Sequence, residues 1–280
     1  MKLISWNIRG LNGPGKNRIL KNMIKQEKPQ ILFLQETKCN SSALDRFVAK
    51  VWPGSFNAAM DADGAFGGLE IVWDSRAIKL DNIHASRNFL QATFRIIGTN
   101  IHGLSTNVYF TQEASLKAGI LNTLSAINHD RPHHLWISGV DFNIITRLEE
   151  KRGGRCRGSQ EGIPLKDFIQ NNWLIDLPFN NGVFTWNNRS AGKQQIASRL
   201  DRFLLSDNAI HLGGDFAASI LPLSGSDHWP ISLHWLHPGN LIRRLFRFED
   251  FWMSHPDFQG LINLEWNNFS PPPVSKMFQF

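Results

Sequence analysis

The chain has 280 residues, of which 42% are hydrophobic and 19% are charged, a composition typical of a folded protein with a sizeable core. No apolar run approaches the roughly 18 residues of a membrane-spanning helix, and no signal peptide precedes the apolar start of the chain, so we expect an intracellular protein that is not secreted and has no membrane partner. The formal net charge of +6 and the pI of about 9.5 suit a polyanionic partner, because each neutralised phosphate releases counterions, although charge alone identifies none.

The first half of the chain alternates short apolar runs with stretches of helical periodicity. Apolar residues recur at helical spacing over residues 19–24, and Pro29 ends that predicted helix. A second helix is predicted over residues 114–127. Strands are predicted over residues 3–6, 31–34, 67–73, 89–97 and 135–137, and a further strand ends at residues 108–109.

Strands dominate the second half, where they follow a helix predicted over residues 163–173. They are predicted over residues 183–186, 199–205, 216–221 and 231–235. Because strands outnumber helices and do not strictly alternate with them, a barrel of repeated βα units is disfavoured. Two sheets packed face to face with helices outside are favoured. We expect this α/β (α+β) domain to span residues 1–236 and an extension with a loose C-terminal tail to span residues 237–280.

Several predicted strands finish on polar residues that a core would not choose. These residues are Asn7, Glu36, the pair Asp141 and Asn143, and the pair Asp227 and His228. One carboxylate at a strand end usually starts a loop or caps a helix, but four such ends can meet at one rim of a sheet. Oxygen ligands suit Mg²⁺ or Mn²⁺, and phosphodiester hydrolysis needs a metal, a base for water and hydrogen-bond donors.

The same residues lie in motifs that resemble, in order, those of the endonuclease/exonuclease/phosphatase superfamily over residues 1–236. The motifs are Trp6-Asn7-Ile8-Arg9-Gly10, Leu34-Gln35-Glu36-Thr37-Lys38, Asn107-Val108-Tyr109, Asp141-Phe142-Asn143, Arg199-Leu200-Asp201-Arg202-Phe203 and Ser226-Asp227-His228-Trp229-Pro230. Within the superfamily, residues 182–186 and 200–206 most resemble the apurinic-type endonuclease of plant-like non-LTR retrotransposons. Residues 246–252 resemble the segment that precedes a reverse transcriptase. Tyr109 is the only tyrosine, so a Tyr-x-Asp-Asp reverse transcriptase core is absent.

The resemblance implies a four-layer αββα sandwich, in which two packed mixed sheets are flanked by helices, and a nuclease that nicks DNA to leave a 3′-hydroxyl and a 5′-phosphate. The implied catalytic residues are Asn7, Glu36, Tyr109, Asp141, Asn143, Asp201, Asp227 and His228. Glu36, helped by Asn7, would hold Mg²⁺ or Mn²⁺. Asp141 would orient or deprotonate water that Asn143 positions, and Tyr109 and His228 would contact the scissile phosphate. Asp201 would keep His228 charged.

Two questions about the metal remain open in the sequence. Asp227 would support either a metal or the water, and the full set of possible ligands is Asn7, Glu36, Asp141, Asn143, Asp227 and His228. The sequence does not decide which of Asp141, Asn143, Asp227 and His228 touches a second ion.

Basic and aromatic residues in two segments predict DNA contacts. One group lies in a Gly-rich loop, and the other surrounds a predicted hairpin after Trp186. The predicted contact residues are Arg152, Arg155, Thr185, Trp186, Arg189, Lys193, Arg199 and Arg202. The alternative for the loop is a solvated surface. We expect a monomeric, nuclear protein whose partner is DNA.

Two other functions are compatible with the motifs. One is a phosphatase of the same superfamily that acts on inositol phosphates or lipid headgroups, and the other is a non-catalytic DNA-binding remnant. Three departures from the family pattern predict a folded but slow nuclease. Val140 and Phe110 stand where glycine is usual, so we expect backbone strain or crowding there. Glu70 follows the Gly-Gly-Leu strand, where it would be a buried charge without an evident partner.

Overall fold

The computed structural model describes residues 1–64, 67–110, 114–129, 135–154, 159–222, 225–236 and 258–268. The chain falls into two units, Met1–Asn240 and Leu241–Phe280, and α6 (Phe258–Asn268) belongs to the second. The predicted boundary between residues 236 and 237 stays a prediction. Across the described ranges, no helix is both long enough and apolar enough to cross a membrane.

The first sheet is built on two parallel strands formed by the apolar runs near the N-terminus. β1 (Lys2–Asn7) pairs in parallel with β2 (Ile31–Gln35), and Asn7 lies opposite Gln35. Antiparallel pairings complete six strands in the order β14-β15-β1-β2-β4-β3. The added strands are β3 (Phe56–Met60), β4 (Leu69–Trp73), β14 (Asp215–Ile220) and β15 (Ile231–Leu236).

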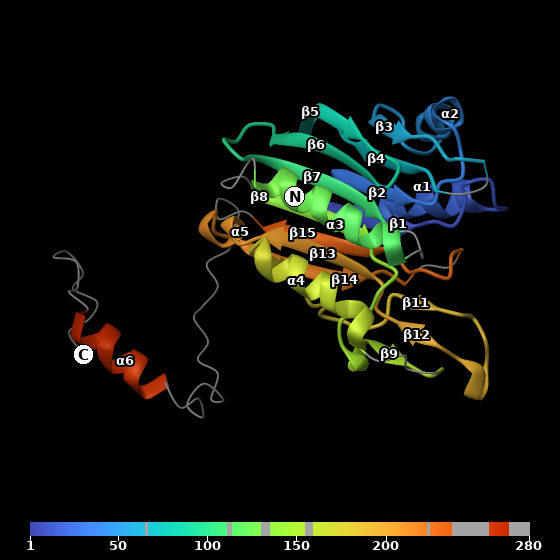
Figure 1. Ribbon diagram of the computed structural model, residues 1–280. Coiled ribbons are helices and arrows are strands. Elements are labelled where there is room, and N and C mark those ends of the chain that lie inside the picture. The colour runs from blue at the N-terminus through green and yellow to red at the C-terminus, as the bar shows by residue number, and fades with distance from the viewer. Residues whose placement is uncertain are drawn as a thin grey trace. The chain divides into compact units, whose positions relative to one another are not determined.

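The second sheet repeats this plan, with the strand order β10-β13-β8-β7-β6-β5. Its parallel pair is β7 (His102–Tyr109) and β8 (Leu135–Asp141), in which Tyr109 lies opposite Asp141. The antiparallel strands are β5 (Ile78–Ala85), β6 (Phe89–Ile96), β10 (Leu174–Asp176) and β13 (Asp201–Ser206). The two mixed sheets confirm the predicted sandwich (Figure 1).

Helices cover the outer face of each sheet. α1 (Lys16–Glu27) and α2 (Ser41–Val51) pack on the first sheet, where Leu20 and Leu44 join the cluster around Leu32. α3 (Ala114–His129) and α4 (Ile163–Asn171) pack on the second sheet, and both can be followed in Figure 1. Successive strand residues point to opposite faces, so Leu3 lies between the sheets while Ile4 faces the helices.

A small third sheet projects beside one end of the sandwich (Figure 1). It consists of β9 (Lys151–Arg152), β11 (Trp186–Asn187) and β12 (Ala197–Ser198). Short helices lie before or between its strands, namely the 3-10 helices η1 (Leu148–Glu150), η2 (Ser159–Gly162) and η3 (Gly192–Gln194); α5 (Asn208–His211) follows β13. A single β-bridge joins Trp186 to His228, which attaches the small sheet to the rim of the first sheet.

The expectation of strain at Val140 and Phe110 is wrong. Neither residue has a positive φ, and both side chains are buried in the cluster under α3 and α4. The Phe110 ring stacks on Phe142 with the ring centroids 5.0 Å apart. Glycine at either position would therefore remove a packed side chain and leave a cavity, so these two residues give no reason to expect a slow nuclease.

Glu70, the third departure, is fully buried in β4. It does have one partner, which corrects the expectation of none, because Asn57 Nδ2 donates to its Oε1 at 3.3 Å. Its Oε2 has no hydrogen-bond partner among the described residues. Burial raises the pKa of Glu70 to about 8, against the lowering effect of the Asn57 bond.

Replacing Glu70 by glutamine is expected to stabilise the protein increasingly as the pH rises from about 4.5 to about 8. A carboxyl whose pKa is raised on folding contributes stability fully below its ordinary pKa of 4.5, and this contribution is lost as the pH rises toward about 8. Glu70→Gln should raise the free energy of unfolding by at least about 1 kcal/mol near pH 8.5. Near pH 5 it should change this free energy little.

Urea unfolding at both pH values measures this difference. Glu149→Gln, at an exposed position, is the matched control and should change stability equally little at each pH. An effect of Glu70→Gln that is the same at both pH values would attribute it to packing rather than to ionisation.

Candidate active site at the rim of the two sheets

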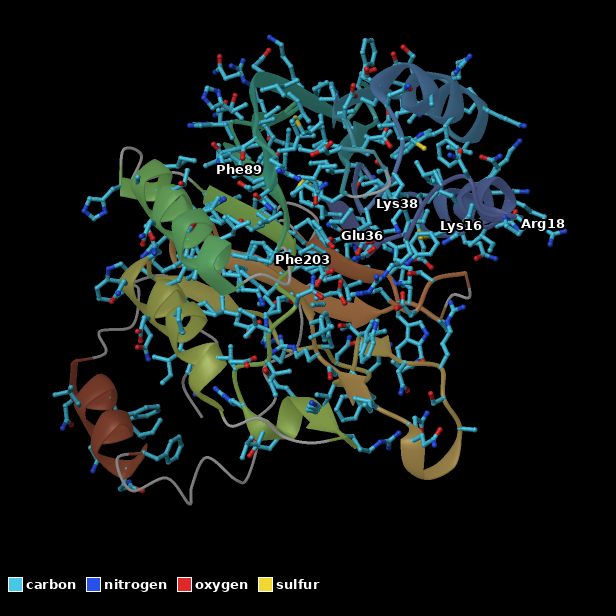
Figure 2. All side chains as sticks on the ribbon, turned by 45° about the vertical axis from the view of Figure 1, so that its right-hand side comes forward. Lys16, Arg18, Glu36, Lys38, Phe89 and Phe203 are labelled. Carbon is cyan, nitrogen blue, oxygen red and sulfur yellow. The ribbon has the colours of Figure 1, made fainter. Side chains whose placement is uncertain are left out.

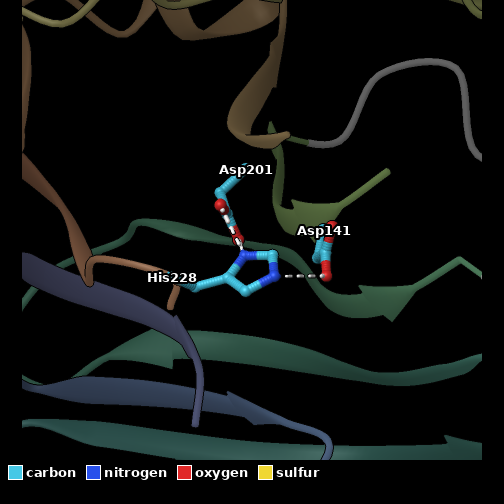
Figure 3. Close-up of side chains that lie close together, drawn as sticks. All are labelled: Asp141, Asp201 and His228. Carbon is cyan, nitrogen blue, oxygen red and sulfur yellow. Dashed lines mark hydrogen bonds and ion pairs between the residues drawn. The ribbon is translucent and has the colours of Figure 1, made fainter. Parts of the chain in front are cut away.

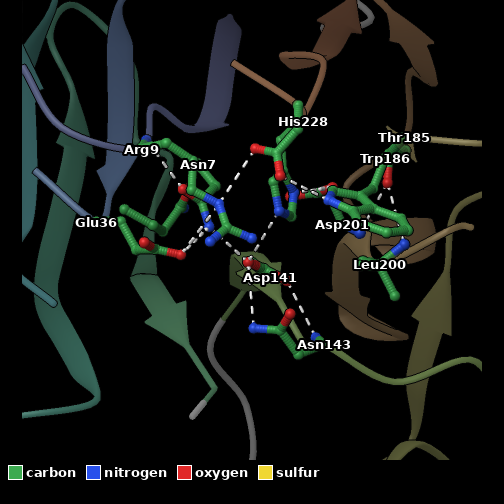
Figure 4. Close-up of polar contacts among 12 residues, drawn as sticks. Asn7, Arg9, Glu36, Asp141, Asn143, Thr185, Trp186, Leu200, Asp201 and His228 are labelled. Carbon is green, nitrogen blue, oxygen red and sulfur yellow. Dashed lines mark hydrogen bonds and ion pairs between the residues drawn. The ribbon is translucent and has the colours of Figure 1, made fainter. Parts of the chain in front are cut away.

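The carboxyl ends of the two parallel strand pairs meet through the side chain of Asn7. Its Nδ2 donates to Glu36 Oε1 at 2.9 Å and to Asp141 Oδ2 at 2.8 Å, so one amide joins the first sheet to the second (Figure 4). All three residues are buried. Glu36 has a φ of 50°, a left-handed conformation that is uncommon for a residue with a side chain.

His228 lies between two carboxylates in the same centre (Figure 3). Its Nδ1 is 3.0 Å from Asp201 Oδ2, and its Nε2 is 3.9 Å from Asp141 Oδ2. Burial lowers the pKa of His228, but the charges of Asp201 and Asp141 outweigh burial and raise it. The imidazole is therefore held in its charged form, and within the described part of the chain its Nε2 has no hydrogen-bond partner.

Buried hydroxyl groups fix the backbone at Asp201 and His228. Thr185 Oγ1 accepts hydrogen bonds from the backbone N–H groups of Leu200 and Asp201, each at 3.0 Å. Ser226 Oγ accepts from the His228 N–H at 3.2 Å. Thr185, which the sequence assigned to DNA contact, is fully buried. The predicted DNA contact of Thr185 is therefore wrong, because the Thr185 hydroxyl group positions Asp201 instead.

Asp227 completes the acidic cluster at the edge of the small sheet. Trp186 Nε1 donates to Asp227 Oδ2 at 2.9 Å, and Arg9 Nε lies 3.1 Å from Asp227 Oδ1. Burial raises the pKa of Asp227, but the Trp186 bond and the Arg9 charge outweigh it and lower the pKa. The hydrogen bond to Asp227 thus holds the Trp186 ring beside the site.

Asn143 and Tyr109 are both neighbours of Asp141, the first through a hydrogen bond and the second as its partner across β7 and β8. Asp141 Oδ1 accepts a hydrogen bond from the backbone N–H of Asn143 at 3.0 Å, while Asn143 Nδ2 donates to the Phe110 carbonyl at 2.8 Å. Burial and then the charge of Glu36 raise the pKa of Tyr109, so its phenol stays a neutral donor. Burial likewise raises the pKa of Asp141, against the opposing charge of His228.

Three basic residues that the sequence reasoning did not select as site residues lie at this rim. Arg9 and Lys38 each approach Glu36 at 3.6 Å, one at each carboxylate oxygen, and Figure 2 shows Lys38 beside Glu36. Lys117 Nζ donates to the Asn143 carbonyl at 3.4 Å. Arg9 and Lys38 lie within two of the motifs but were given no role, and Lys117 lies in none, because their roles depend on how the loops after β1, β2 and β8 fold back.

The predicted DNA contacts of Arg199 and Arg202 are wrong, because both side chains are buried in ion pairs. Arg202 is fully buried and Arg199 nearly so, and both pair with Glu150 and Asp176. Arg202 Nη1 lies 2.6 Å from Asp176 Oδ2, and its Nη2 lies 2.5 Å from Glu150 Oε2. These guanidinium groups are committed to a buried ion cluster and do not face a nucleic acid.

The other predicted DNA contacts remain predictions. Arg152 and Arg189 are exposed, and the Arg152 guanidinium lies 5.5 Å from the centre of the Phe184 ring. Trp186 is half-buried. Arg155 and the side chain of Lys193 lie outside the described residues.

The donor chemistry of the rim fits a hard divalent cation. Glu36, Asp227 and Asn7 offer carboxylate and amide oxygen atoms, which Mg²⁺ and Mn²⁺ prefer, and the Arg9 guanidinium shows that positive charge is accommodated between Glu36 and Asp227. Ligand atoms of Asp141, Asp201 and His228 also lie within 4.8 Å of one another. A charged imidazole, however, has no lone pair for a metal.

Comparisons with known proteins agree with this fold. A sequence model described as the endonuclease/exonuclease/phosphatase family matches residues 4–228, whereas no curated protein matches the chain. Among solved structures, the AP endonuclease LMAP from Leishmania major is similar, with 19% identity, a TM-score of 0.67, and coverage of 84% of this chain and 87% of that one.

Two further structures are a second endonuclease and a phosphatase. The endonuclease domain of TRAS1, a telomere-specific non-LTR retrotransposon, has 16% identity and a TM-score of 0.63, with 88% of this chain and 99% of that one covered. The mannosyl-6-phosphatase Bt3783 from Bacteroides thetaiotaomicron has 15% identity and a TM-score of 0.59, with 84% and 99% covered. At these identities the likeness shows the fold alone.

Proposed function

The chain belongs to the endonuclease/exonuclease/phosphatase family, and from this premise we propose that it is a divalent-metal-dependent nuclease that nicks DNA, leaving a 3′-hydroxyl and a 5′-phosphate. One observation carries the proposal. Asn7 joins Glu36 to Asp141 in a buried centre, where the Nε2 atom of the charged His228 has no hydrogen-bond partner among the residues that the structure describes. A buried donor of this kind suits a phosphate oxygen.

Each residue has a role that follows from its surroundings. A divalent ion held by Glu36, with Asn7, would neutralise phosphate charge when bound. His228 and Tyr109 donate hydrogen bonds to non-bridging phosphate oxygens, since one is charged and the other is a neutral phenol. Asp141 accepts the proton of the attacking water, because burial raises its pKa and makes it a stronger base.

Asn143 and the remaining carboxylates support these groups. Asn143 fixes Asp141 through its backbone N–H and positions the water. Asp201 keeps His228 charged, and Asp227 ties Trp186 and Arg9 to the site. Attack on phosphorus and cleavage of the bond to the 3′ oxygen give the two product ends.

The positive net charge of the protein and its similarity to solved endonuclease structures support DNA as the proposed substrate. The net charge of +6 and the exposed Arg152 and Arg189 favour a polyanion. LMAP, an AP endonuclease, and the endonuclease domain of TRAS1 share the fold. We propose a monomer that acts in the nucleus, derived from a retrotransposon endonuclease.

A phosphatase of small phosphate esters is the second candidate, since Bt3783 shares the fold. Supercoiled plasmid and inositol phosphates, each with Mg²⁺, separate the two functions. Nicked plasmid whose ends a polymerase extends, and a ligase reseals, supports the nuclease. Phosphate release from the esters without nicking supports the phosphatase. Plasmid retention in a mobility-shift gel with neither product would indicate a non-catalytic DNA-binding protein.

Replacing Asp201 by asparagine is expected to shift the pH profile of nicking. The charge of Asp201 raises the pKa of His228, so its removal lowers that pKa and the charged imidazole is lost at a lower pH. Asp201→Asn should therefore lose most activity at the alkaline end and least at the acidic end. Nicking rates across the pH range, with the exposed Asp167→Asn as control, measure this shift. An equal loss at every pH would mean that Asp201 only orients the ring.

A further inference from the structure

Arg9 lies inside the cluster of carboxylates that the proposed function assigns to metal and water. Its Nε is 3.1 Å from Asp227 Oδ1 and 3.6 Å from Glu36 Oε1, and Figure 4 shows the guanidinium between the elements that carry the site. The guanidinium also interacts electrostatically with Asp141 and Tyr109. The side chain thus interacts with three acidic residues of the site, Glu36, Asp141 and Asp227.

The backbone holds Arg9 there. Its φ is 52°, and its N–H donates to Asn7 Oδ1 at 3.1 Å, so the residue that joins Glu36 to Asp141 also fixes the turn that presents Arg9. A left-handed conformation is costly for a residue with a side chain. The hydrogen bond to Asn7 holds Arg9 in this conformation beside the site.

We propose that Arg9 is a resident cation of the active site, which competes with the divalent ion for Glu36 and Asp227 and transfers to the substrate phosphate when the ion binds. This inference rests on the proposed function. Guanidinium is charged at every working pH and can bind either a carboxylate or a phosphate in two-pronged geometry. The side chain is 35% exposed, so it can turn toward a bound strand.

The competition predicts that wild-type protein binds the metal ion weakly in the absence of DNA. Removing Arg9 frees one oxygen atom each of Glu36 and Asp227, and partly exposed ion pairs of this kind are individually weak. We expect roughly 10-fold tighter metal binding for Arg9→Met. In nicking assays at saturating metal, the same variant should show a raised KM for DNA.

Lys38 provides a matched control for the loss of a positive charge. It is also 35% exposed and lies at the same 3.6 Å from Glu36, but on Oε2 and without an ion pair to Asp227. If only the net charge near Glu36 matters, Lys38→Met and Arg9→Met should tighten metal binding equally. If Arg9 is the competitor, the effect of Arg9→Met should be several-fold larger.

Isothermal titration of Mn²⁺ into the full chain, without DNA, tests the proposal. The expected order of affinity is Arg9→Met above Lys38→Met, with Arg9→Lys close to wild type because it keeps the charge. Arg9→Gln replaces Arg9→Met if circular dichroism shows that the latter does not fold. Metal binding that is unchanged or weaker in Arg9→Met, or equally tightened in Lys38→Met, would overturn it. A wild-type protein that binds Mn²⁺ without nicking DNA would refute the proposed function and leave this comparison valid.

Discussion

Replacing Glu36 by glutamine or Asp141 by asparagine should each lower the nicking rate by on the order of 10²-fold or more. Both side chains are buried and bonded to the same amide, Asn7 Nδ2, and each substitution removes a charge while keeping the shape. Glu36→Gln removes a negative ligand for the metal. Asp141→Asn removes the group that accepts the proton of water.

Two measurements separate these roles. Glu36→Gln should weaken the binding of Mn²⁺ in calorimetry, whereas Asp141→Asn should leave that binding closer to wild type. Asp167→Asn, an exposed carboxylate on α4, is the control and should nick at the wild-type rate. Activity within a few-fold of wild type in either variant would remove that residue from the mechanism.

Replacing Arg202 by methionine is expected to cost about 3–5 kcal/mol of stability, as removal of one partner from a buried ion pair typically does. Arg202 is fully buried, and its loss leaves Glu150 and Asp176 short of compensating charge. Burial raises the pKa of Glu150, but the bonds and charge of Arg202 outweigh it and lower the pKa to about 2. This carboxylate therefore contributes stability above about pH 4.5, which is lost as the pH falls toward 2.

Chemical unfolding at neutral pH measures this loss. Arg87→Met removes an exposed ion pair with Asp63 and should change stability by less than about 1 kcal/mol. A similarly small effect of Arg202→Met would show that water or rearrangement compensates for the lost guanidinium.

Glu150 ends η1, directly before β9, so the cluster ties the small sheet to β13. Arg202→Met should therefore also disturb the contact of Trp186 with Asp227.

The sequence predicted the central strands well because their apolar runs are buried on both faces. Residues 3–6 and 31–34 are continuous runs of this kind, and they form β1 and β2. The edge strand β5 was missed, since its second half is exposed and leaves no alternating pattern. α2 was missed although Asn40 caps it, accepting from the Ala43 N–H at 2.9 Å.

The sequence predicted those site residues that belong to a motif and lie at the rim of the two sheets. Asn7, Glu36, Asp141 and His228 do so because each ends or adjoins a central strand. The sequence could not show that Arg202 is buried, since its partner Glu150 lies 52 residues away and meets it only after β13 pairs with β8. The buried Asn107, which donates to the carbonyls of Leu34 and Glu70, joins the sheets for the same non-local reason.

The most direct test is nicking of supercoiled plasmid by the wild-type chain with Mg²⁺, compared with the same reaction in EDTA and with Asp141→Asn. The proposed function predicts nicked circles with Mg²⁺, intact plasmid with EDTA, and a rate lower by on the order of 10²-fold or more for Asp141→Asn. Equal nicking in EDTA, or full activity of Asp141→Asn, would contradict metal-dependent hydrolysis at this site.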